Sequence, residues 1–306
     1  MKLSIIIPLY NEANNIMNLD SNIKTFIKKI ESCNYEIIIV NAGSTDNTLA
    51  ELETRFLDIS NVHIYSTKRL YPGGARNKGV SYSKGDTLLF MDAGIKYSEN
   101  FVEELIKNIE AGDYDVAWGE LVRKPTDKLS KILVDLTYSN NSSKVIPAMI
   151  IKKEKFLQLG GFKEDLRALE DTDFIRRIDR IGLNQVRVRN AYSFYYDFPK
   201  TSYEIYKKWK LYNEHTIYSG LRKNKERAAL IMNLGLIFGI INRKVRILIV
   251  PLTILLTILK FRKKGIKIYN NNQISKYIFI SLVIDFATYL GLTKGIINRF
   301  WKKVLK

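Results

Sequence analysis

The stretch Gly73–Gly94, GGARNKGVSYSKGDTLLFMDAG, decides how the rest of this 306-residue chain is interpreted. The glycines at its start predict a turn that leads into a short helix carrying Arg76. The apolar run Thr87–Met91 predicts a buried strand that ends at Asp92. Because ligands of open α/β sheets bind outside the carboxyl ends of the strands, Asp92 is the first candidate for a functional site.

Apolar runs that predict strands alternate along the chain with segments whose apolar residues have helical spacing. The predicted strands are 3–9, 36–40, 62–65, 87–91, 116–121 and 145–151. The predicted helices are 11–30, a segment ending at Phe56, 99–109, 152–159, 170–181 and 203–211, whereas 122–143 has no regular pattern. This alternation predicts right-handed βαβ units and an α/β fold with a mostly parallel sheet.

The formal net charge of +18 is concentrated near the C-terminus. Residues 1–200 carry 28 Lys/Arg against 27 Asp/Glu, whereas residues 201–306 carry 21 against 4. The same basic region contains the apolar runs 228–241, 247–259 and 277–292. Basic clusters beside apolar runs predict a surface that binds an anionic membrane, and the apolar runs argue against a nucleic-acid-binding arm.

Each apolar run of this tail is shorter than the roughly 20 residues of a membrane-spanning helix. Pro251 interrupts the second run and Asp285 the third. Two interpretations follow: amphipathic helices in the cytoplasmic leaflet, or short spans with Lys and Arg at their ends. A soluble helical subdomain or an oligomer interface is the remaining alternative. The single cysteine, Cys33, excludes a disulfide framework and agrees with a reducing compartment.

Five motifs occur in a fixed order along the first two thirds of the chain. They are IIIPLYNE at 5–12, IVNAGSTD at 39–46, ARNKG at 75–79, FMDAG at 90–94, and GGF at 160–162 followed by Glu170-Asp171. With these motifs the chain resembles the inverting family 2 glycosyltransferases, which have the GT-A fold, over roughly residues 3–215. We therefore expect a glycosyltransferase domain at 1–222, followed at 223–306 by a helical, membrane-associated region.

The resemblance assigns several residues to a nucleotide-sugar donor. Pro8, Tyr10 and Glu12 are expected over the base and ribose, and Asn41 is expected against the base, where the family commonly has Asp. Arg76 is expected at the diphosphate, because its fork of donors suits phosphate oxygens. The alternative for Arg76 is a solvated helix face.

The family's D-x-D element usually supplies a second carboxylate where this chain has Gly94. Mg²⁺ or Mn²⁺ can still be held by one carboxylate together with substrate phosphates, which leaves Asp92 as the expected metal ligand. Alternatively, Arg76, Lys78 or Lys200 neutralises the diphosphate without a metal.

Asp171 resembles the family's catalytic base, and Glu170 is expected to support the acceptor or the helix start. The reaction needs a base because the acceptor hydroxyl loses a proton as it attacks the anomeric carbon. A single carboxylate in this role implies one displacement and therefore inversion. A structural alternative is that these acidic residues only favour the start of a helix. Trp118 has two interpretations of equal weight, a sugar-stacking ring or a core residue.

Together these implications describe a hexosyltransferase-type enzyme with a UDP-sugar as the expected donor. The Gln-x-x-Arg-Trp element of the family's processive synthases is absent, which favours transfer of a single sugar. The expected acceptor is lipid-linked or a glycan, at the cytoplasmic face of the cell membrane, in surface polysaccharide or glycolipid synthesis. The alternative, which Gly94 and Asn41 keep open, is a catalytically silent nucleotide-sugar-binding or scaffold subunit. Nucleic acid is not an expected partner.

Overall fold

The computed structural model describes residues 1–31, 33–112, 114–137, 144–219, 258–259, 261, 266 and 271–304. The chain divides into two compact units. Unit 1 comprises Met1–Lys124 and Asn141–Asp197, and unit 2 comprises Pro125–Asn140 and Phe198–Lys306. The boundary predicted near residue 222, the run 228–241 and most of the run 247–259 lie outside the described residues.

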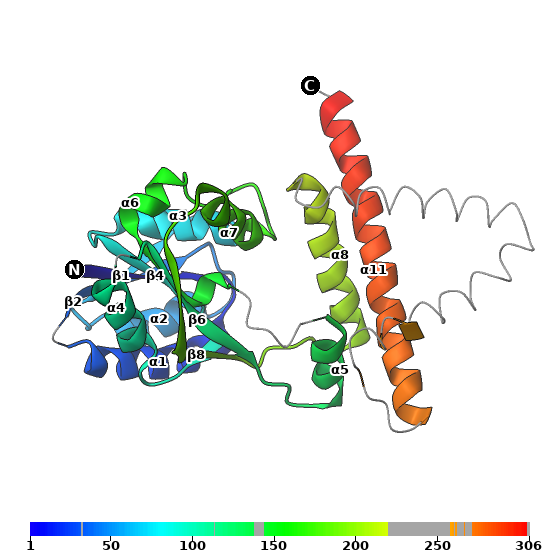
Figure 1. Ribbon diagram of the computed structural model, residues 1–306, viewed down its shortest axis with the longest axis horizontal. Coiled ribbons are helices and arrows are strands. Elements are labelled where there is room, and N and C mark those ends of the chain that lie inside the picture. The colour runs from blue at the N-terminus through cyan, green and yellow to red at the C-terminus, as the bar shows by residue number, and fades with distance from the viewer. Residues whose placement is uncertain are drawn as a thin grey trace, which may run out of the picture. The chain divides into compact units, whose positions relative to one another are not determined.

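In unit 1 the described residues form one eight-stranded sheet (Figure 1). Its strands are β1 (Lys2–Leu9), β2 (Asn34–Asn41), β3 (Val62–Ser66), β4 (Thr87–Phe90), β5 (Ile95–Tyr97), β6 (Val116–Arg123), β7 (Met149–Lys152) and β8 (Gln185–Tyr195). The strand order is β3-β2-β1-β4-β7-β6-β8-β5. The first four strands in this order are parallel, β7 is antiparallel to β4 and β6, and β8 is parallel to β6 and antiparallel to β5. The predicted α/β fold is confirmed, with parallel pairing among β3, β2, β1 and β4.

Helices cover both faces of this sheet (Figure 1). One face carries α1 (Ile16–Lys29), α2 (Thr48–Phe56) and α4 (Phe101–Ala111), and the other carries α3 (Pro72–Tyr82), α6 (Lys153–Gln158) and α7 (Glu170–Ile181). Short 3-10 helices, η1 (Ala13–Asn15) and η2 (Ile146–Ala148), precede α1 and β7. The sheet is therefore buried on both sides, which explains strands that are apolar on both faces.

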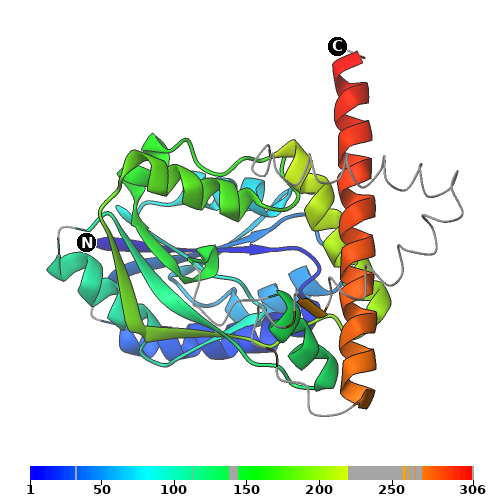
Figure 2. The ribbon, with the colours of Figure 1, turned by 45° about the vertical axis from the view of Figure 1, so that its right-hand side comes forward.

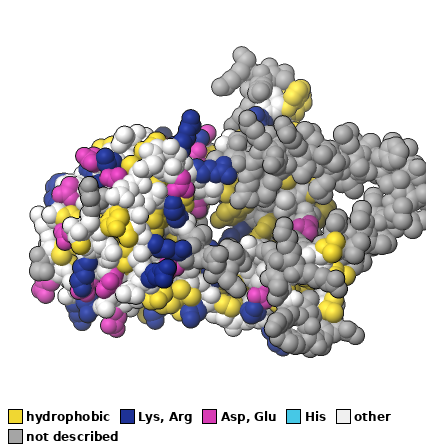
Figure 3. All heavy atoms as spheres, viewed as in Figure 1, with side chains coloured by type: hydrophobic (Ala, Val, Ile, Leu, Met, Phe, Trp, Pro, Cys, Tyr) yellow, Lys and Arg dark blue, Asp and Glu magenta, His cyan; other side chains and the backbone are white. Residues whose placement is uncertain are grey.

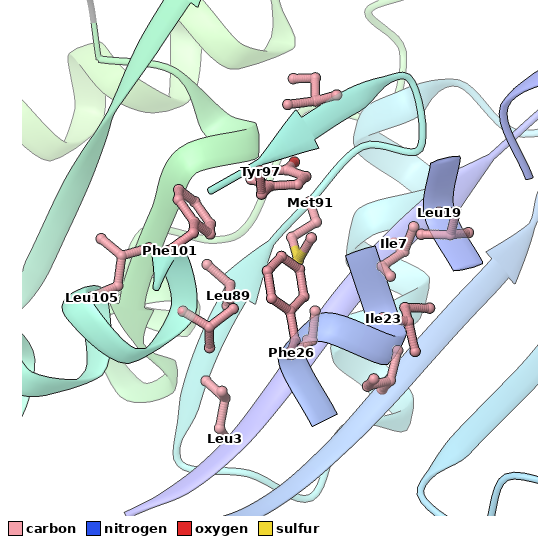
Figure 4. Close-up of a cluster of buried hydrophobic side chains, with 14 of the residues drawn as sticks. Leu3, Ile7, Leu19, Ile23, Phe26, Leu89, Met91, Tyr97, Phe101 and Leu105 are labelled. Carbon is pink, nitrogen blue, oxygen red and sulfur yellow. The ribbon is translucent and has the colours of Figure 1, made fainter. Parts of the chain in front are cut away.

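Strand β1 shows how its sequence produces the two layers. Ile5 and Ile7 belong to the core cluster on the α1 side, whereas Ile6 belongs to the cluster on the α3 side. Figure 4 shows part of the first cluster, in which the rings of Phe26 and Phe101 have centroids 6.3 Å apart. Each fully buried side chain of this size contributes about 1.5–3 kcal/mol, so alternation along one strand fastens helices to both faces.

Helix α3 lies unusually close to the sheet because of Gly79. A Cβ added at Gly79 would lie 2.5 Å from Cγ2 of Ile6, a distance that no real side chain tolerates. The glycine in the motif ARNKG therefore sets the distance between α3 and β1. This close packing brings Arg76, one turn earlier on α3, to the carboxyl edge of the sheet.

Three elements were not predicted from the sequence, and one of them is the short strand β5 (Ile95–Tyr97). Residues 128–137, within the segment without a regular pattern, form α5 (Lys128–Thr137), which buries Ile132, Leu133 and Leu136. Strand β8 was missed because its buried residues do not alternate regularly, and its pairing with β6 changes register between Trp118 and Glu120. A bulge of this kind breaks the period of two on which strand prediction depends.

Unit 2 contains α5, α8 (Ser202–Tyr218) and α11 (Asn271–Val304), and α8 lies beside α11 (Figure 2). The close approach depends on Gly295, where an added Cβ would lie 2.7 Å from the carbonyl oxygen of Glu214. Lys294 of α11 also pairs with Glu214 at 3.0 Å. Among the described residues, one segment, Gln273–Trp301, is long and apolar enough to cross a membrane, with a mean hydropathy of 1.5.

Candidate active site

A cavity of about 310 Å³ lies at the carboxyl ends of β1, β2 and β4 in unit 1. Six residues singled out in the sequence line it, namely Pro8, Tyr10, Glu12, Arg76, Asp92 and Gly94. The lining also includes Asn15, Arg69, Tyr195 and Asp197, which were not predicted. The parallel strands β1, β2 and β4 end at the same edge, which is why segments far apart in the sequence meet here.

Arg76 forms the centre of a buried ion bridge. Its Nη2 donates to Oδ1 of Asp92 and its Nη1 donates to Oε1 of Glu170, both at 3.0 Å. Arg76 is only 5% exposed, so the alternative of a solvated helix face is wrong. Burial alone would lower the pKa of Arg76, but the charges of Asp92 and Glu170 raise it above its ordinary value. The guanidinium therefore connects the end of β4 to the start of α7.

Glu170 is the more deeply buried carboxylate of this bridge. Its side chain is 9% exposed, compared with 36% for Asp92. Burial raises the pKa of Glu170 to about 7, the neighbouring charge of Asp171 adds to the rise, and Arg76 opposes it. Glu170 therefore gains a proton near neutral pH, whereas Asp92 keeps one side open to the cavity.

The start of α7 holds three acidic residues in different environments. Asp173 is buried and pairs with Lys163 at 2.7 Å and Arg177 at 2.8 Å, so its role is structural. Asp171 is half-buried, and its Oδ1 accepts hydrogen bonds from the backbone N–H and the hydroxyl of Thr172. Neither Glu170 nor Asp171 is among the described residues that line the cavity, and Glu170 is joined to the lining through Arg76.

Leu169 immediately precedes this acidic cluster and has a left-handed backbone, with φ of 70°. This conformation is uncommon for a branched, non-glycine residue, and it costs free energy that the surrounding structure must offset. The backbone turn at Leu169 sets the direction in which α7 begins, and hence the placement of Glu170 and Asp171.

Asp92 is held in place from behind by Tyr97 of β5. The backbone N–H of Asp92 donates to the Tyr97 hydroxyl at 3.0 Å, and that hydroxyl donates to the carbonyl oxygen of Pro147 at 3.0 Å. Burial raises the pKa of Tyr97 well above its ordinary value, so the hydroxyl stays neutral. No sequence signal singled out Tyr97, because its partner Pro147 lies 50 residues away.

Gly94 leaves room for a pair of polar side chains from the first loop. A Cβ added at Gly94 would lie 3.3 Å from Nδ2 of Asn15, and that same Nδ2 donates to Oε2 of Glu12 at 2.6 Å. Burial raises the pKa of Glu12; the hydrogen bond from Asn15 opposes the rise, and the charge of Asp92 adds to it. The position of the family's second carboxylate is thus next to an existing carboxylate, that of Glu12.

Tyr10 and Arg69 form one wall of the cavity. The guanidinium of Arg69 lies over the Tyr10 ring, 3.2 Å from its centroid. Arg69 is exposed, whereas Arg76 is buried and paired, so the two cations of the lining differ in their freedom to meet a ligand. Lys78, proposed as a further cation, instead places its Nζ 4.9 Å from the centre of the Tyr82 ring.

Asn41 and Trp118 are buried instead of facing the cavity. Oδ1 of Asn41 accepts from the backbone N–H of Ser44 at 3.2 Å, which closes the turn after β2. Trp118 is 2% exposed and its indole donates to Oε1 of Gln185 at 2.9 Å, so the core interpretation of Trp118 is the one that the structure shows.

The charges of the lining determine what the cavity can bind. Glu12, Asp92 and Asp197 are carboxylates, and Arg69 and Arg76 are cations, of which Arg76 is already paired with two carboxylates. Within the part of the chain that the structure describes, no three His, Cys, Asp or Glu side chains form a ready cage for a metal ion. An anionic ligand in this cavity therefore meets Arg69 as the exposed cation of the lining. Because three carboxylates also line the cavity, such a ligand needs a further positive charge beside Asp92.

Comparison with known proteins gives matches over most of unit 1. The sequence model of the family described as Glycosyl transferase family 2 matches residues 4–163. The poly(ribitol-phosphate) beta-glucosyltransferase of Bacillus spizizenii is 28% identical over 211 residues, 64% of this chain and 32% of that protein. The chain spans from 19% to 61% of the length of the first curated relatives that it matches.

Two solved structures show the same fold. S. aureus TarS, residues 1–349 in complex with UDP-GlcNAc, has a TM-score of 0.53 at 18% identity, covering 92% of this chain and 91% of that one. The mannosyltransferase PcManGT from Pyrobaculum calidifontis, in complex with GDP-Man and Mn²⁺, has a TM-score of 0.55 at 15% identity, covering 95% and 73%.

Proposed function

Because the chain belongs to glycosyl transferase family 2, we propose that it transfers a single sugar from a nucleoside diphosphate sugar to an acceptor hydroxyl, with inversion. The observation that supports this most is the buried bridge from Asp92 through Arg76 to Glu170. It ties the carboxylate at the cavity to the helix that begins with Glu170 and Asp171. Donor binding and proton removal then depend on one rigid group of side chains.

In this mechanism Asp171 accepts the proton of the acceptor hydroxyl as the oxygen attacks the anomeric carbon. The nucleoside diphosphate leaves from the opposite face of the sugar, so one displacement inverts the configuration. Glu170 positions Asp171 by holding the start of α7 against Arg76. A glycosidase would need two carboxylates flanking the glycosidic bond, which does not fit a site that carries one base and a nucleotide cavity.

Asp92 fits a divalent cation, Mg²⁺ or Mn²⁺, held jointly with donor phosphates. Its carboxylate is partly exposed at the cavity, and Mg²⁺ is commonly bound by one or two carboxylates together with substrate phosphates. When bound, such an ion neutralises charge on the departing diphosphate. The structure of PcManGT, which has the same fold, is a complex with GDP-Man and Mn²⁺, which supports this assignment.

The base of the donor is expected to meet the wall that Tyr10 and Arg69 form, with Pro8 and Glu12 nearby. Solved structures with the same fold are complexes with UDP, UDP-GlcNAc and GDP-Man, so we propose uracil as the first choice of base and guanine as the second. Asn41 acts in this region by shaping the turn after β2.

We place the acceptor at the cytoplasmic face of the cell membrane and expect it to be lipid-linked, in surface polysaccharide or glycolipid synthesis. The apolar segment Gln273–Trp301 and the net charge of residues 201–306 support attachment to an anionic membrane. In contrast, Lys and Arg are interspersed with Asp and Glu over the face of unit 1 in Figure 3.

Calorimetric titration of the detergent-solubilised protein with UDP, GDP and dTDP, each with and without Mn²⁺, tests the donor site. We expect one nucleotide to bind, Mn²⁺ to be required, and Asp92→Asn to abolish the Mn²⁺ effect. Asp58→Asn is the matched control, because Asp58 is an exposed carboxylate away from the cavity. If no nucleotide binds, the transferase proposal fails and the alternative of a silent scaffold subunit gains support.

A further inference from the structure

A groove between α5 and α11 in unit 2 lies outside the candidate active site. It consists of two adjoining cavities of about 570 and 470 Å³, which share Lys128, Ile132 and Lys276. Each cavity has a size typical of sites for small organic ligands, about 300–1,000 Å³. The first cavity also has Lys131 in its lining, and the second also has Phe279.

The groove is apolar along its floor. Ile132 of α5 and Ile280 of α11 are nearly fully buried there, at 7% and 5% exposed, and Leu129 lies beside them in the lining. Phe279 of α11 is 55% exposed at its edge. A small inorganic anion leaves this floor in contact with water, whereas a hydrocarbon chain covers it, so the floor fits the tail of a lipid.

The rim of the groove is basic. Lys128 on α5 and Lys276 on α11 are exposed, and neither forms an ion pair with any residue that the structure describes. Lys131 is paired with Asp135, and Asp127 is the carboxylate of the lining. The lining therefore carries a net positive charge, concentrated on two lysines that come from different helices.

The two helices are joined by a hydrogen bond and the start of α5 is capped, so the groove is preformed. The hydroxyl of Tyr277 on α11 donates to Oδ2 of Asp135 on α5 at 2.6 Å. At the start of α5, the backbone N–H of Ser130 donates to Oδ1 of Asp127, whose own N–H donates to the Ser130 hydroxyl. A preformed groove loses little conformational entropy when a ligand binds.

We propose that this groove binds one membrane lipid with a phosphate head group. The phosphate lies between Lys128 and Lys276, and the hydrocarbon chain follows Ile132, Phe279 and Ile280. The α11 wall of the groove lies within the apolar segment Gln273–Trp301. Attachment of this segment to a membrane therefore brings the groove to the lipid head groups. The site rests on the proposed membrane attachment of unit 2 but does not depend on sugar transfer.

Native mass spectrometry of the full chain in detergent tests this site, with phosphatidylglycerol as the probe and phosphatidylcholine as the neutral-headgroup comparison. We expect one tightly bound phosphatidylglycerol per chain and little retained phosphatidylcholine. The variant Lys128→Gln/Lys276→Gln should bind phosphatidylglycerol about 30-fold more weakly, as expected for two lysines near a phosphate. Millimolar inorganic phosphate should not displace the lipid.

The matched control is Lys207→Gln/Lys210→Gln, which removes the same charge from α8, where these lysines lie over tyrosine rings. It should retain the lipid, and both variants should keep the thermal unfolding midpoint of the parent protein. An equal loss in both variants would mean diffuse electrostatic attraction and would overturn the proposal. Displacement by inorganic phosphate, or equal retention of phosphatidylcholine, would overturn it too. Nucleotide binding, measured separately, decides the transferase proposal.

Discussion

Removing Arg76 should destabilise unit 1 more than any change to a surface ion pair. In Arg76→Gln, the side chain that donates to Asp92 and Glu170 loses its charge, and Glu170 remains 9% exposed without a counter-ion. Breaking a buried pair by removing one partner costs about 3–5 kcal/mol. Two hydrogen bonds to charged groups, at roughly 1.5–3 kcal/mol each, give a similar total.

Most of this cost should come from the Glu170 side of the bridge, because Asp92 can be solvated from the cavity. The double variant Arg76→Gln/Glu170→Gln should therefore recover about half of the lost free energy of unfolding. The experiment belongs at pH 8, where Glu170, with a pKa of about 7, is mostly ionised.

Urea unfolding followed by the fluorescence of Trp118 measures this effect in unit 1. Trp118 is buried in the core of unit 1, and Trp209→Phe with Trp301→Phe removes the other two tryptophans. Arg55→Gln is the control, since Arg55 forms a partly exposed pair with Glu51 that is worth about 1 kcal/mol or less. A loss under about 1 kcal/mol for Arg76→Gln, or strict additivity in the double variant, would refute the argument.

Two further predictions concern stability. The folded-state pKa of Glu170 is raised above its unfolded value, so its stabilising contribution is present below pH 4.5 and is lost as pH rises through about 7. Relative to Glu170→Gln, the parent protein should lose about 3 kcal/mol of unfolding free energy over this range; a difference that stays constant with pH would contradict the raised pKa. Gly79→Ala should cost about 1–3 kcal/mol because its Cβ would clash with Ile6. Gly74→Ala, in the same helix but with ordinary contacts, should be neutral or stabilising by up to about 1 kcal/mol; equal effects in thermal unfolding would disprove this explanation.

The sequence was sufficient to predict the parallel half of the sheet and the position of Asp92, because both follow from local patterns. Continuous apolar runs predict buried strands, and a polar residue directly after such a run lies at the carboxyl edge. Pro8, Tyr10 and Glu12 were assigned to the donor through the family resemblance instead, and they line the cavity at this edge because they end and follow β1. Their roles toward a donor remain predictions.

The environment of Arg76 could not be predicted because its partner Glu170 is 94 residues away. No local pattern distinguishes an arginine that faces solvent from one that a distant carboxylate holds in the interior. Asp197 was missed for a related reason: it follows β8, whose irregular pairing with β6 hid the strand itself. Arg69 lies before the turn at the start of α3 and carries no signal of its own until Tyr10 is folded against it.

The route of the chain between the two units affects how the protein can be divided. The chain leaves unit 1 after Lys124 and again after Asp197. These two exits are adjacent because β6 and β8 pair up to Arg123 and Tyr195. The backbone N–H of Lys124 also donates to the carbonyl oxygen of Tyr195. Stopping the chain at Asp197 would therefore leave α5 behind, without the α11 residues that contact it. Its apolar side chains would then be exposed on the fragment, which favours aggregation. A fragment of unit 1 for crystallisation should replace residues 125–140 with a short hydrophilic linker in addition to ending at Asp197.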